Sequence, residues 1–131
     1  MRVFIIDDSA IFRERLIGML ADVEGIEIVG YAEDAFSAID GVRKVKPDVV
    51  ILDIQMPGAA SGIYALEKIR IENPAPKIIM LTNYSSPQYR KRCADSGAAF
   101  FFDKSTEFEM VPEVLKMLVR SSQNQLIKTV D

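Results

Sequence analysis

The sequence has no histidine and only one cysteine, Cys93, among its 131 residues. Without histidine the chain cannot form a Ser-His-Asp triad, a histidine-ligated zinc site or a phosphohistidine of its own. With one cysteine it can form neither a disulfide framework nor a metal site of several thiolates. These absences exclude several common kinds of catalytic and structural site.

Long apolar runs and an excess of positive charge are also absent. No apolar run approaches the ~20 residues that span a bilayer, and the start, MRVFIIDDSA, reaches two aspartates too early for a secretory signal. We therefore expect a cytoplasmic protein without membrane contact. The net charge is −3, whereas nucleic-acid-binding domains usually carry a basic surface, so we expect no direct binding of nucleic acid by this chain.

The composition that remains is that of one globular domain, with 49% hydrophobic and 27% charged residues. Five apolar runs, at residues 3–6, 26–31, 49–52, 78–81 and 98–102, alternate with longer segments of helical spacing. Polar residues hardly interrupt the runs, which is typical of strands covered on both faces. The alternation predicts a doubly wound, flavodoxin-like (βα)5 α/β fold. Its five-stranded parallel sheet would have the order 2-1-3-4-5, with helices on both faces.

Residues that favour helix ends mark the segments between the strands. Those expected to cap the first four helices are Ser9, Asp34, Ser61 and Ser86, and Gly97 is expected to follow the fourth. The capping-box spacing of Thr106 and Glu109 predicts the start of the fifth helix. We expect residues 1–120 to form the domain and residues 121–131, SSQNQLIKTVD, to form a polar C-terminal tail.

Polar residues stand at the ends of four predicted strands. Asp7 and Asp8 follow the first strand, Asp53 the third, Thr82 the fourth and Lys104 the fifth. Ligands of doubly wound sheets bind at the carboxyl ends of the strands, so we expect these five residues to face one crevice. Each alone is typical of a turn, a cap or a solvated charge. Their convergence is what indicates a site.

The charges in this predicted crevice indicate its ligands. Two carboxylates ~5 Å apart repel by roughly 3 kcal/mol at an effective dielectric constant of about 20, and one lysine cannot neutralise three carboxylates. A hard divalent cation can, and Mg²⁺ typically binds one or two carboxylates, several waters and a phosphate oxygen. The sequence therefore predicts Mg²⁺ as the cofactor and phosphoryl chemistry as the reaction.

Four motifs at these positions, IIDDS, ILDIQMPG, LTNYS and FFFDKS, resemble those of the response-regulator receiver domain of two-component signalling. The resemblance covers about residues 1–120 and favours a single-domain regulator of the chemotaxis type. It implies that Asp53 is the phosphoacceptor. It also implies that Asp7, Asp8, Asp53 and the backbone carbonyl of Gln55 hold Mg²⁺.

The same resemblance implies a switch. Thr82 and Lys104 would hold the phosphoryl oxygens, and Thr82 with Phe101 would alter the surface around the fourth helix, fifth strand and fifth helix. The implied donor is a sensor histidine kinase or a phosphotransfer protein, and the implied target is an unidentified downstream protein. A dimer through the same surface is also implied. We do not expect an enzyme, beyond promotion of its own phosphorylation and dephosphorylation.

Three positions depart from the family pattern. Ser105 follows Lys104 where many receivers have proline, and the switch aromatic, Phe101, is not tyrosine. The loop GAASG looks one residue longer than the pattern leads us to expect. None of these departures touches the five polar residues of the predicted crevice.

Three alternatives stay open. The first is the receiver half of a DNA-binding transcription factor, truncated before its output domain, which the sequence FFDKSTEFEMVPEVL favours. The second is a receiver-fold interaction module that works without phosphorylation, which leaves the acidic cluster unexplained. The third is a haloacid-dehalogenase-type phosphatase with Asp53 as nucleophile, but Gln55 stands where that family has a second aspartate. We prefer a stand-alone phosphorylated regulator.

Overall fold

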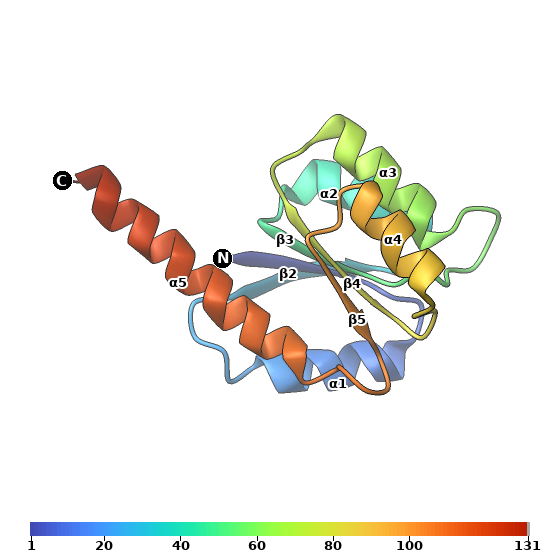
Figure 1. Cartoon of the computed structure of the whole chain (residues 1–131), viewed down its shortest axis with the longest axis horizontal. Helices are drawn as coiled ribbons and strands as arrows, with labels where there is room; N and C mark the ends of the chain where they lie inside the picture. Colours follow the sequence, from blue (N-terminus) through green and yellow to red (C-terminus); the bar gives the residue numbers. More distant parts are fainter. Residues whose placement is uncertain (131) are drawn as a thin grey trace.

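The computed structural model describes the backbone of residues 1–130 and the side chains of residues 1–124. Within these residues, strands and helices alternate along the chain (Figure 1). The strands are β1 (Arg2–Ile6), β2 (Glu27–Ala32), β3 (Val49–Leu52), β4 (Lys77–Thr82) and β5 (Phe100–Asp103). The helices are α1 (Ala10–Leu20), α2 (Ala35–Val45), α3 (Gly62–Glu72), α4 (Pro87–Asp95) and α5 (Met110–Val130). All neighbouring strands are parallel in the order β2-β1-β3-β4-β5, which confirms the predicted doubly wound fold.

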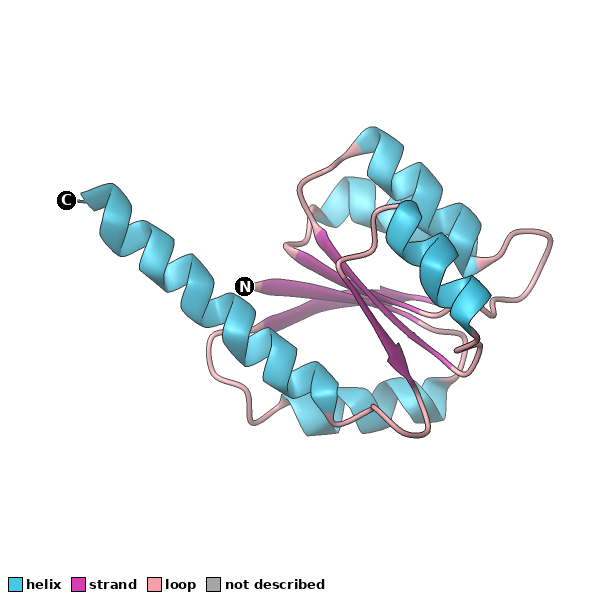
Figure 2. Ribbon diagram, viewed as in Figure 1, coloured by secondary structure: helices cyan, strands magenta, loops and turns pink. Residues whose placement is uncertain are grey.

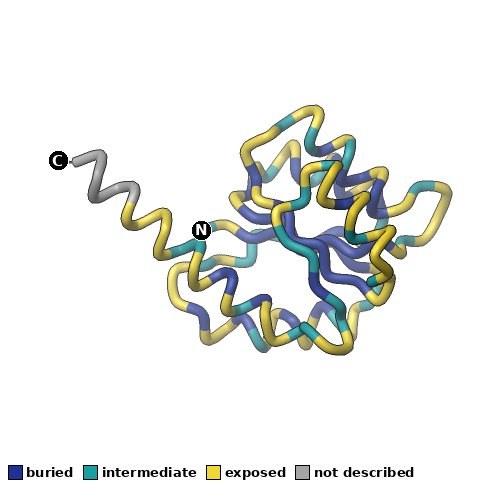
Figure 3. Tube along the Cα trace, viewed as in Figure 1, coloured by how far each residue is buried: buried dark blue, intermediate teal, exposed yellow. Residues whose placement is uncertain are grey.

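The sheet divides the core into two layers. Helices α2, α3 and α4 cover one face, and α1 and α5 cover the other (Figure 2). Side chains alternate along β1, so that Phe4 and Ile6 pack on the first face while Val3 and Ile5 pack on the second. The central strands are buried almost throughout (Figure 3), because helices cover both of their faces.

The predicted starts of the first four helices are confirmed. The side chains of Ser9, Asp34, Ser61 and Ser86 each accept a hydrogen bond from the backbone N–H three residues later. Each bond satisfies one of the N–H groups that a helix start leaves unpaired. Gly97 follows α4 with φ of 103°, a left-handed conformation that glycine adopts without strain.

The fifth helix does not begin where the capping-box spacing of Thr106 and Glu109 predicted. It begins at Met110. The carboxylate of Asp103 accepts hydrogen bonds from the N–H groups of Ser105 and Thr106, at 2.7 and 3.1 Å. Such local bonds to an aspartate side chain compete with helix formation, so turns precede the helix here.

Helix α5 continues to Val130, and its C-terminal part extends away from the sheet (Figure 1). Residues 121–130, which we expected to form a polar tail, therefore continue the helix backbone, and residue 131 lies outside the described residues. Val111 and Leu115 are fully buried and anchor the first turns of α5. Within the described part of the chain, no helix is both long and apolar enough to cross a membrane.

Candidate functional site

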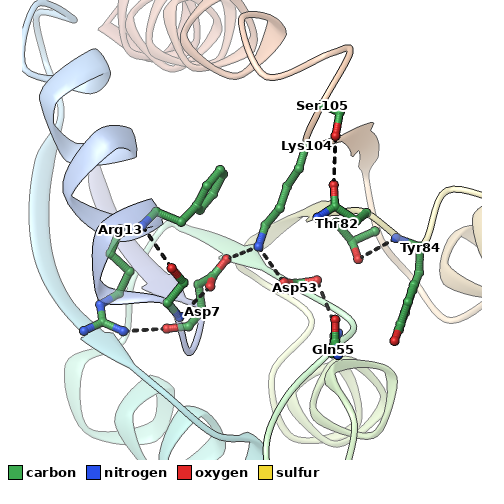
Figure 4. A network of polar contacts seen from close by, with 11 residues as sticks. Asp7, Arg13, Asp53, Gln55, Thr82, Tyr84, Lys104 and Ser105 are labelled. Carbon is green, nitrogen blue, oxygen red and sulfur yellow. Dashed lines mark hydrogen bonds and ion pairs between the residues drawn. The ribbon is translucent and has the colours of Figure 1, made fainter.

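The carboxyl ends of four strands bring the predicted residues together. Asp7 follows β1, Asp53 follows β3, Thr82 ends β4 and Lys104 follows β5. The Lys104 ammonium lies 2.7 Å from Asp7 Oδ2 and 2.7 Å from Asp53 Oδ2 (Figure 4). Side chains that are far apart in the sequence thus form one charged cluster, as the strand-end pattern predicted.

Backbone contacts hold Asp53 in the middle of this cluster. Its N–H donates to the Ile6 carbonyl oxygen at 3.1 Å, and its Oδ1 accepts the Gln55 backbone N–H at 3.2 Å. Gly62, at the start of α3, approaches so closely that a Cβ there would stand 1.7 Å from the Asp53 carbonyl oxygen. Because its side chain is also only 6% exposed, Asp53 has little freedom to move.

Asp7 and Asp8 complete an acidic cluster with Asp53. One carboxylate oxygen from each of the three lies within 4.8 Å of the others. Asp7 is buried, with its Oδ1 accepting the Ser9 N–H at 2.9 Å and its carbonyl oxygen accepting a hydrogen bond from Arg13 at 2.7 Å. Asp8 is exposed, so the cluster is open to solvent on that side.

Burial and charge oppose each other at this site. Burial raises the pKa of Asp7, and the hydrogen bonds from Lys104 and Ser9 offset this only in part. Burial works to lower the pKa of Lys104, but the hydrogen bonds and Coulomb attraction from Asp53 and Asp7 outweigh it and raise that pKa. Lys104 therefore stays charged beside the two carboxylates that it bridges.

The donor set of the cluster fits a hard divalent cation. One oxygen from each of three carboxylates lies within 4.8 Å of the others, and two of the three pair with the Lys104 ammonium. All three offer the oxygen ligands that Mg²⁺ prefers. The backbone of Gln55 turns back onto Asp53 through its N–H, which places it beside the cluster. A ligand role for the Gln55 carbonyl stays a prediction.

Thr82 and Phe101, the predicted switch pair, lie on the β4–β5 side of the site. Thr82 is fully buried, and its Oγ1 accepts the Tyr84 N–H at 3.2 Å while its carbonyl oxygen accepts the Lys104 N–H at 3.0 Å. Phe101 is half-buried and pairs across the sheet with Met80, two residues before Thr82. The switch role of the pair stays a prediction.

Arg90 of α4 makes contacts that no sequence pattern reveals. Its guanidinium lies 4.8 Å from the centroid of the Phe101 ring, donates to Glu107 Oε1 at 2.7 Å and donates to the Ser85 carbonyl oxygen at 3.1 Å. Cys93 is the one buried residue among those of α4. Arg90 therefore links α4 to Phe101 of β5 and to Glu107 in the segment after that strand.

Two further residues of the site were not predicted, and both lie on α1. Arg13 is buried and joins the Asp7 carbonyl oxygen to Glu33, whose Oε1 is 3.0 Å away. The ring centroid of Phe12 lies 4.2 Å from Lys104 Nζ. In the sequence, Phe12 and Leu16 are spaced as on one face of a helix, which indicates a core face and gives no signal for contact with the lysine.

Comparison with known sequences shows the family of this domain. The family model of the response regulator receiver domain matches residues 3–116. Response regulator GacA of Pseudomonas aeruginosa is 30% identical over 118 residues, which cover 90% of this chain and 55% of GacA. A protein-glutamate methylesterase/protein-glutamine glutaminase of Desulfotalea psychrophila is 33% identical over 131 residues, covering 98% of this chain and 35% of that protein. The chain thus spans about half, or less, of the length of these curated relatives.

Solved structures show the same fold. The response regulator domain of Thermotoga maritima CheB matches with a TM-score of 0.80 and 30% identity, covering 95% of this chain and 96% of that one. The isolated REC domain of RcsB from Salmonella enterica serovar Typhimurium, in the presence of phosphomimetic BeF3⁻, matches with a TM-score of 0.85 and 28% identity, covering 92% and 88%. The family match spans all the strand ends that build the charged cluster. The chain belongs to the response regulator receiver domain family of two-component signalling.

Proposed function

We propose that this receiver domain accepts a phosphoryl group on Asp53 and thereby switches the surface formed by α4, β5 and α5. The observation that supports this best is the Lys104 ammonium, which bridges Asp53 and Asp7 at 2.7 Å each. A cation already held beside the accepting carboxylate lies close enough to neutralise charge on an incoming phosphoryl group. A purely structural role would not account for three mutually repelling carboxylates in one crevice.

In the proposed reaction, one carboxylate oxygen of Asp53 attacks the phosphorus of a phosphohistidine on a sensor histidine kinase or a phosphotransfer protein. The O–P bond forms as the P–N bond breaks, and the imidazole nitrogen leaves with the electron pair. Lys104 neutralises charge on the transferring group, and the fixed backbone of Asp53 orients its carboxylate. Water later attacks the acyl phosphate, which releases inorganic phosphate and restores the carboxylate. The chain would thus act only on itself and would not be an enzyme for other substrates.

Mg²⁺ is the cofactor that this donor set supports. Asp7, Asp8 and Asp53 would hold it, with the Gln55 carbonyl as a further ligand. When bound, Mg²⁺ supplies positive charge that offsets the charge of the phosphoryl oxygens.

The proposed switch begins at Thr82. Phosphorylation adds nearly two negative charges and three acceptor oxygens. The Thr82 hydroxyl, which now accepts the Tyr84 N–H, would donate to one of these oxygens, and Phe101 would fill the space that it leaves. Helix α4 would follow, since Arg90 links it to Phe101 and Cys93 is its one buried residue. Such a change acts by biasing an equilibrium between two conformations.

The variant Asp53→Asn tests the phosphoacceptor. With Mg²⁺ and the small donor acetyl phosphate, the wild-type domain should gain the mass of one phosphoryl group in intact-mass spectrometry, and Asp53→Asn should gain none. Asp40→Asn, at an exposed aspartate of α2, is the matched control and should be labelled at the wild-type rate. Wild-type labelling of the Asp53→Asn variant would overturn the assignment.

A second candidate function follows from the length of the relatives. The chain covers 55% of GacA, and one solved relative is RcsB bound to the promoter rprA in the presence of phosphomimetic BeF3⁻. This supports a receiver half whose target is a DNA-binding output domain of the same protein, with no nucleic-acid binding by the receiver itself. The reading frame of the encoding gene beyond residue 131 separates this candidate from a stand-alone regulator.

The proposed switch and an interaction module that works without phosphorylation differ in whether partner binding depends on phosphorylation. We place the domain in the cytoplasm and expect the α4–β5–α5 surface to bind a downstream protein or a second copy of the domain. Pull-down experiments and light scattering, each with and without beryllofluoride and Mg²⁺, measure both outcomes. Identical partners and identical mass in the two conditions would contradict the proposed switch.

A further inference from the structure

The aromatic ring of Phe12 lies against the Lys104 ammonium, with 4.2 Å between Nζ and the ring centroid. Phe12 belongs to the first turn of α1, the helix that begins directly after Asp7 and Asp8. We propose that Phe12 is a positioning residue, whose ring face keeps Lys104 in place beside Asp53 for phosphorylation. This role rests on the proposed function of Asp53 and assigns a new part of the site to α1.

The surroundings of the ammonium show why a ring face matters here. A lysine ammonium has three N–H donors and is strongly hydrated in water. Asp7 and Asp53 each lie 2.7 Å from it, and the side chain of Lys104 is only 12% exposed. Much of its water has therefore been removed, and the Phe12 ring lies against it in addition to the two carboxylates. The negative face of an aromatic ring attracts a cation, whereas an aliphatic side chain at the same place does not.

Phe12 is itself held firmly. Its backbone N–H donates to the Ser9 hydroxyl at 3.2 Å, the bond that caps α1. Its ring packs on Phe108 with the centroids 5.2 Å apart and the planes at 60°. Because Phe108 lies in the segment between β5 and α5 that begins with Lys104, the ring of Phe12 packs on the same segment that carries the lysine.

A neutral ring suits a lysine that must change partners. During phosphorylation Lys104 has to turn from its present carboxylates toward the phosphoryl oxygens. A third carboxylate would compete with those oxygens, and open solvent would let the flexible four-carbon side chain swing away. The ring does neither, so the ammonium stays close to Asp53 but remains free to exchange one anion for another.

Fluorinated phenylalanines separate this role from packing. Mono-, di- and trifluorophenylalanine at position 12 keep the shape of the ring but progressively weaken its attraction for a cation. The rate of labelling by acetyl phosphate should fall stepwise along the series, reaching about fivefold to tenfold for the trifluoro ring. Phe12→Leu should show a similar loss. The same series at Phe36, which is 60% exposed on α2, is the control and should leave the rate unchanged.

A second readout tests the contact without phosphorylation. The ring current of Phe12 should move the terminal methylene protons of Lys104 upfield of those of the other lysines in NMR spectra, with Lys104→Arg providing the assignment. Phe12→Leu should abolish this shift. No upfield shift in the wild type, or equal labelling rates along the fluorine series, would overturn the role of Phe12 alone. A wild-type domain that shows the shift but is not labelled would instead overturn the proposed function on which the role depends.

Discussion

The carbonyl oxygen of Asp53 occupies the place where a side chain on Gly62 would begin, since a Cβ there would lie 1.7 Å from it. Gly62 also donates its N–H to the Ile54 carbonyl oxygen at 2.8 Å. The first residue of α3 is thus in direct contact with the backbone of the proposed phosphoacceptor. Only a residue without a Cβ permits this approach.

Gly62→Ala should therefore destabilise the domain by about 3 kcal/mol and slow the labelling of Asp53, because the backbone of one or both residues must shift. Gly18→Ala is the control: it lies on α1, and a Cβ there meets no atom within 4 Å. It should stabilise the domain by about 1 kcal/mol, the usual gain from replacing glycine in a helix. Urea unfolding and acetyl phosphate labelling measure both effects. Equal stability of the two variants would contradict the close contact.

Lys104→Met should destabilise the domain in the absence of Mg²⁺. It removes the cation between Asp7 and Asp53, whose side chains are 4% and 6% exposed, and leaves their charges unpaired. Breaking a buried pair in this way typically costs about 3 kcal/mol. Added Mg²⁺ should then raise the stability of Lys104→Met by more than it raises that of the wild type. Lys91→Met, which removes an exposed ion pair with Asp95, should change the stability by less than about 0.5 kcal/mol and respond to Mg²⁺ like the wild type.

Asp7→Asn should stabilise the domain at neutral pH without Mg²⁺, by an amount on the order of 1 kcal/mol. The variant avoids the cost of burying a charge and, to a smaller extent, the repulsion by Asp53, and loss of the ion pair with Lys104 partly offsets this gain. Burial raises the pKa of Asp7 above its ordinary value of 3.8. The wild-type carboxyl group thus contributes stability that is fully present below pH 3.8 and is lost as the pH rises through the raised pKa.

The advantage of Asp7→Asn should accordingly shrink as the pH falls from neutral toward 3.8. The difference between wild-type and variant unfolding curves at each pH isolates Asp7 from the other carboxyl groups that titrate in this range. With saturating Mg²⁺ the order should reverse, since a ligand at about 100 times its Kd stabilises the wild type by about 2.7 kcal/mol. A variant that stays less stable than the wild type at every pH without Mg²⁺ would show that the ion pair outweighs the cost of burial.

Arg90→Ala should loosen α4 and raise the reactivity of Cys93 toward a thiol reagent. The Cys93 side chain is fully buried, and burial raises its pKa to about 11, so it reacts only when the helix opens. Loss of the contacts of Arg90 with Glu107 and Phe101 should speed labelling about tenfold, which corresponds to 1.4 kcal/mol. Lys91→Ala, on the exposed side of the same helix, should leave the labelling rate unchanged. Equal rates for the two variants would show that α4 is held by other contacts.

The charged cluster could be predicted from sequence because a single rule, that parallel strands present their carboxyl ends together, places Asp7, Asp53, Thr82 and Lys104. The start of α5 was harder to predict, because two local hydrogen-bonding patterns compete there. The capping-box spacing of Thr106 and Glu109 favoured a helix start at Thr106. Instead, the Asp103 carboxylate accepts a hydrogen bond from the Thr106 backbone N–H. Both patterns are local, and their relative strength decides the outcome.

The side-chain contacts that α1 makes with distant segments could not be predicted. The hydrophobic pattern of α1 assigns Phe12 to the core, where it does pack, but it does not show that the ring also meets a lysine from the loop after β5. Arg13 stands among apolar positions, and only the folded chain shows that Asp7 and Glu33 compensate its burial. A periodic pattern reports which face of a helix is buried, and carries no information on the side chain that meets it.

Helix α4 has a single buried residue, which affects how easily the helix can move. Helix α3, on the same face of the sheet, buries Gly62, Ile63, Ala65, Leu66 and Ile69, whereas α4 buries Cys93 alone. Because fewer buried contacts hold α4 than α3, we expect α4 to move more easily than its neighbour in the same layer. If the proposed switch operates, a modest gain of interaction energy at the strand ends would suffice to move α4, while α3 would keep Asp53 in place.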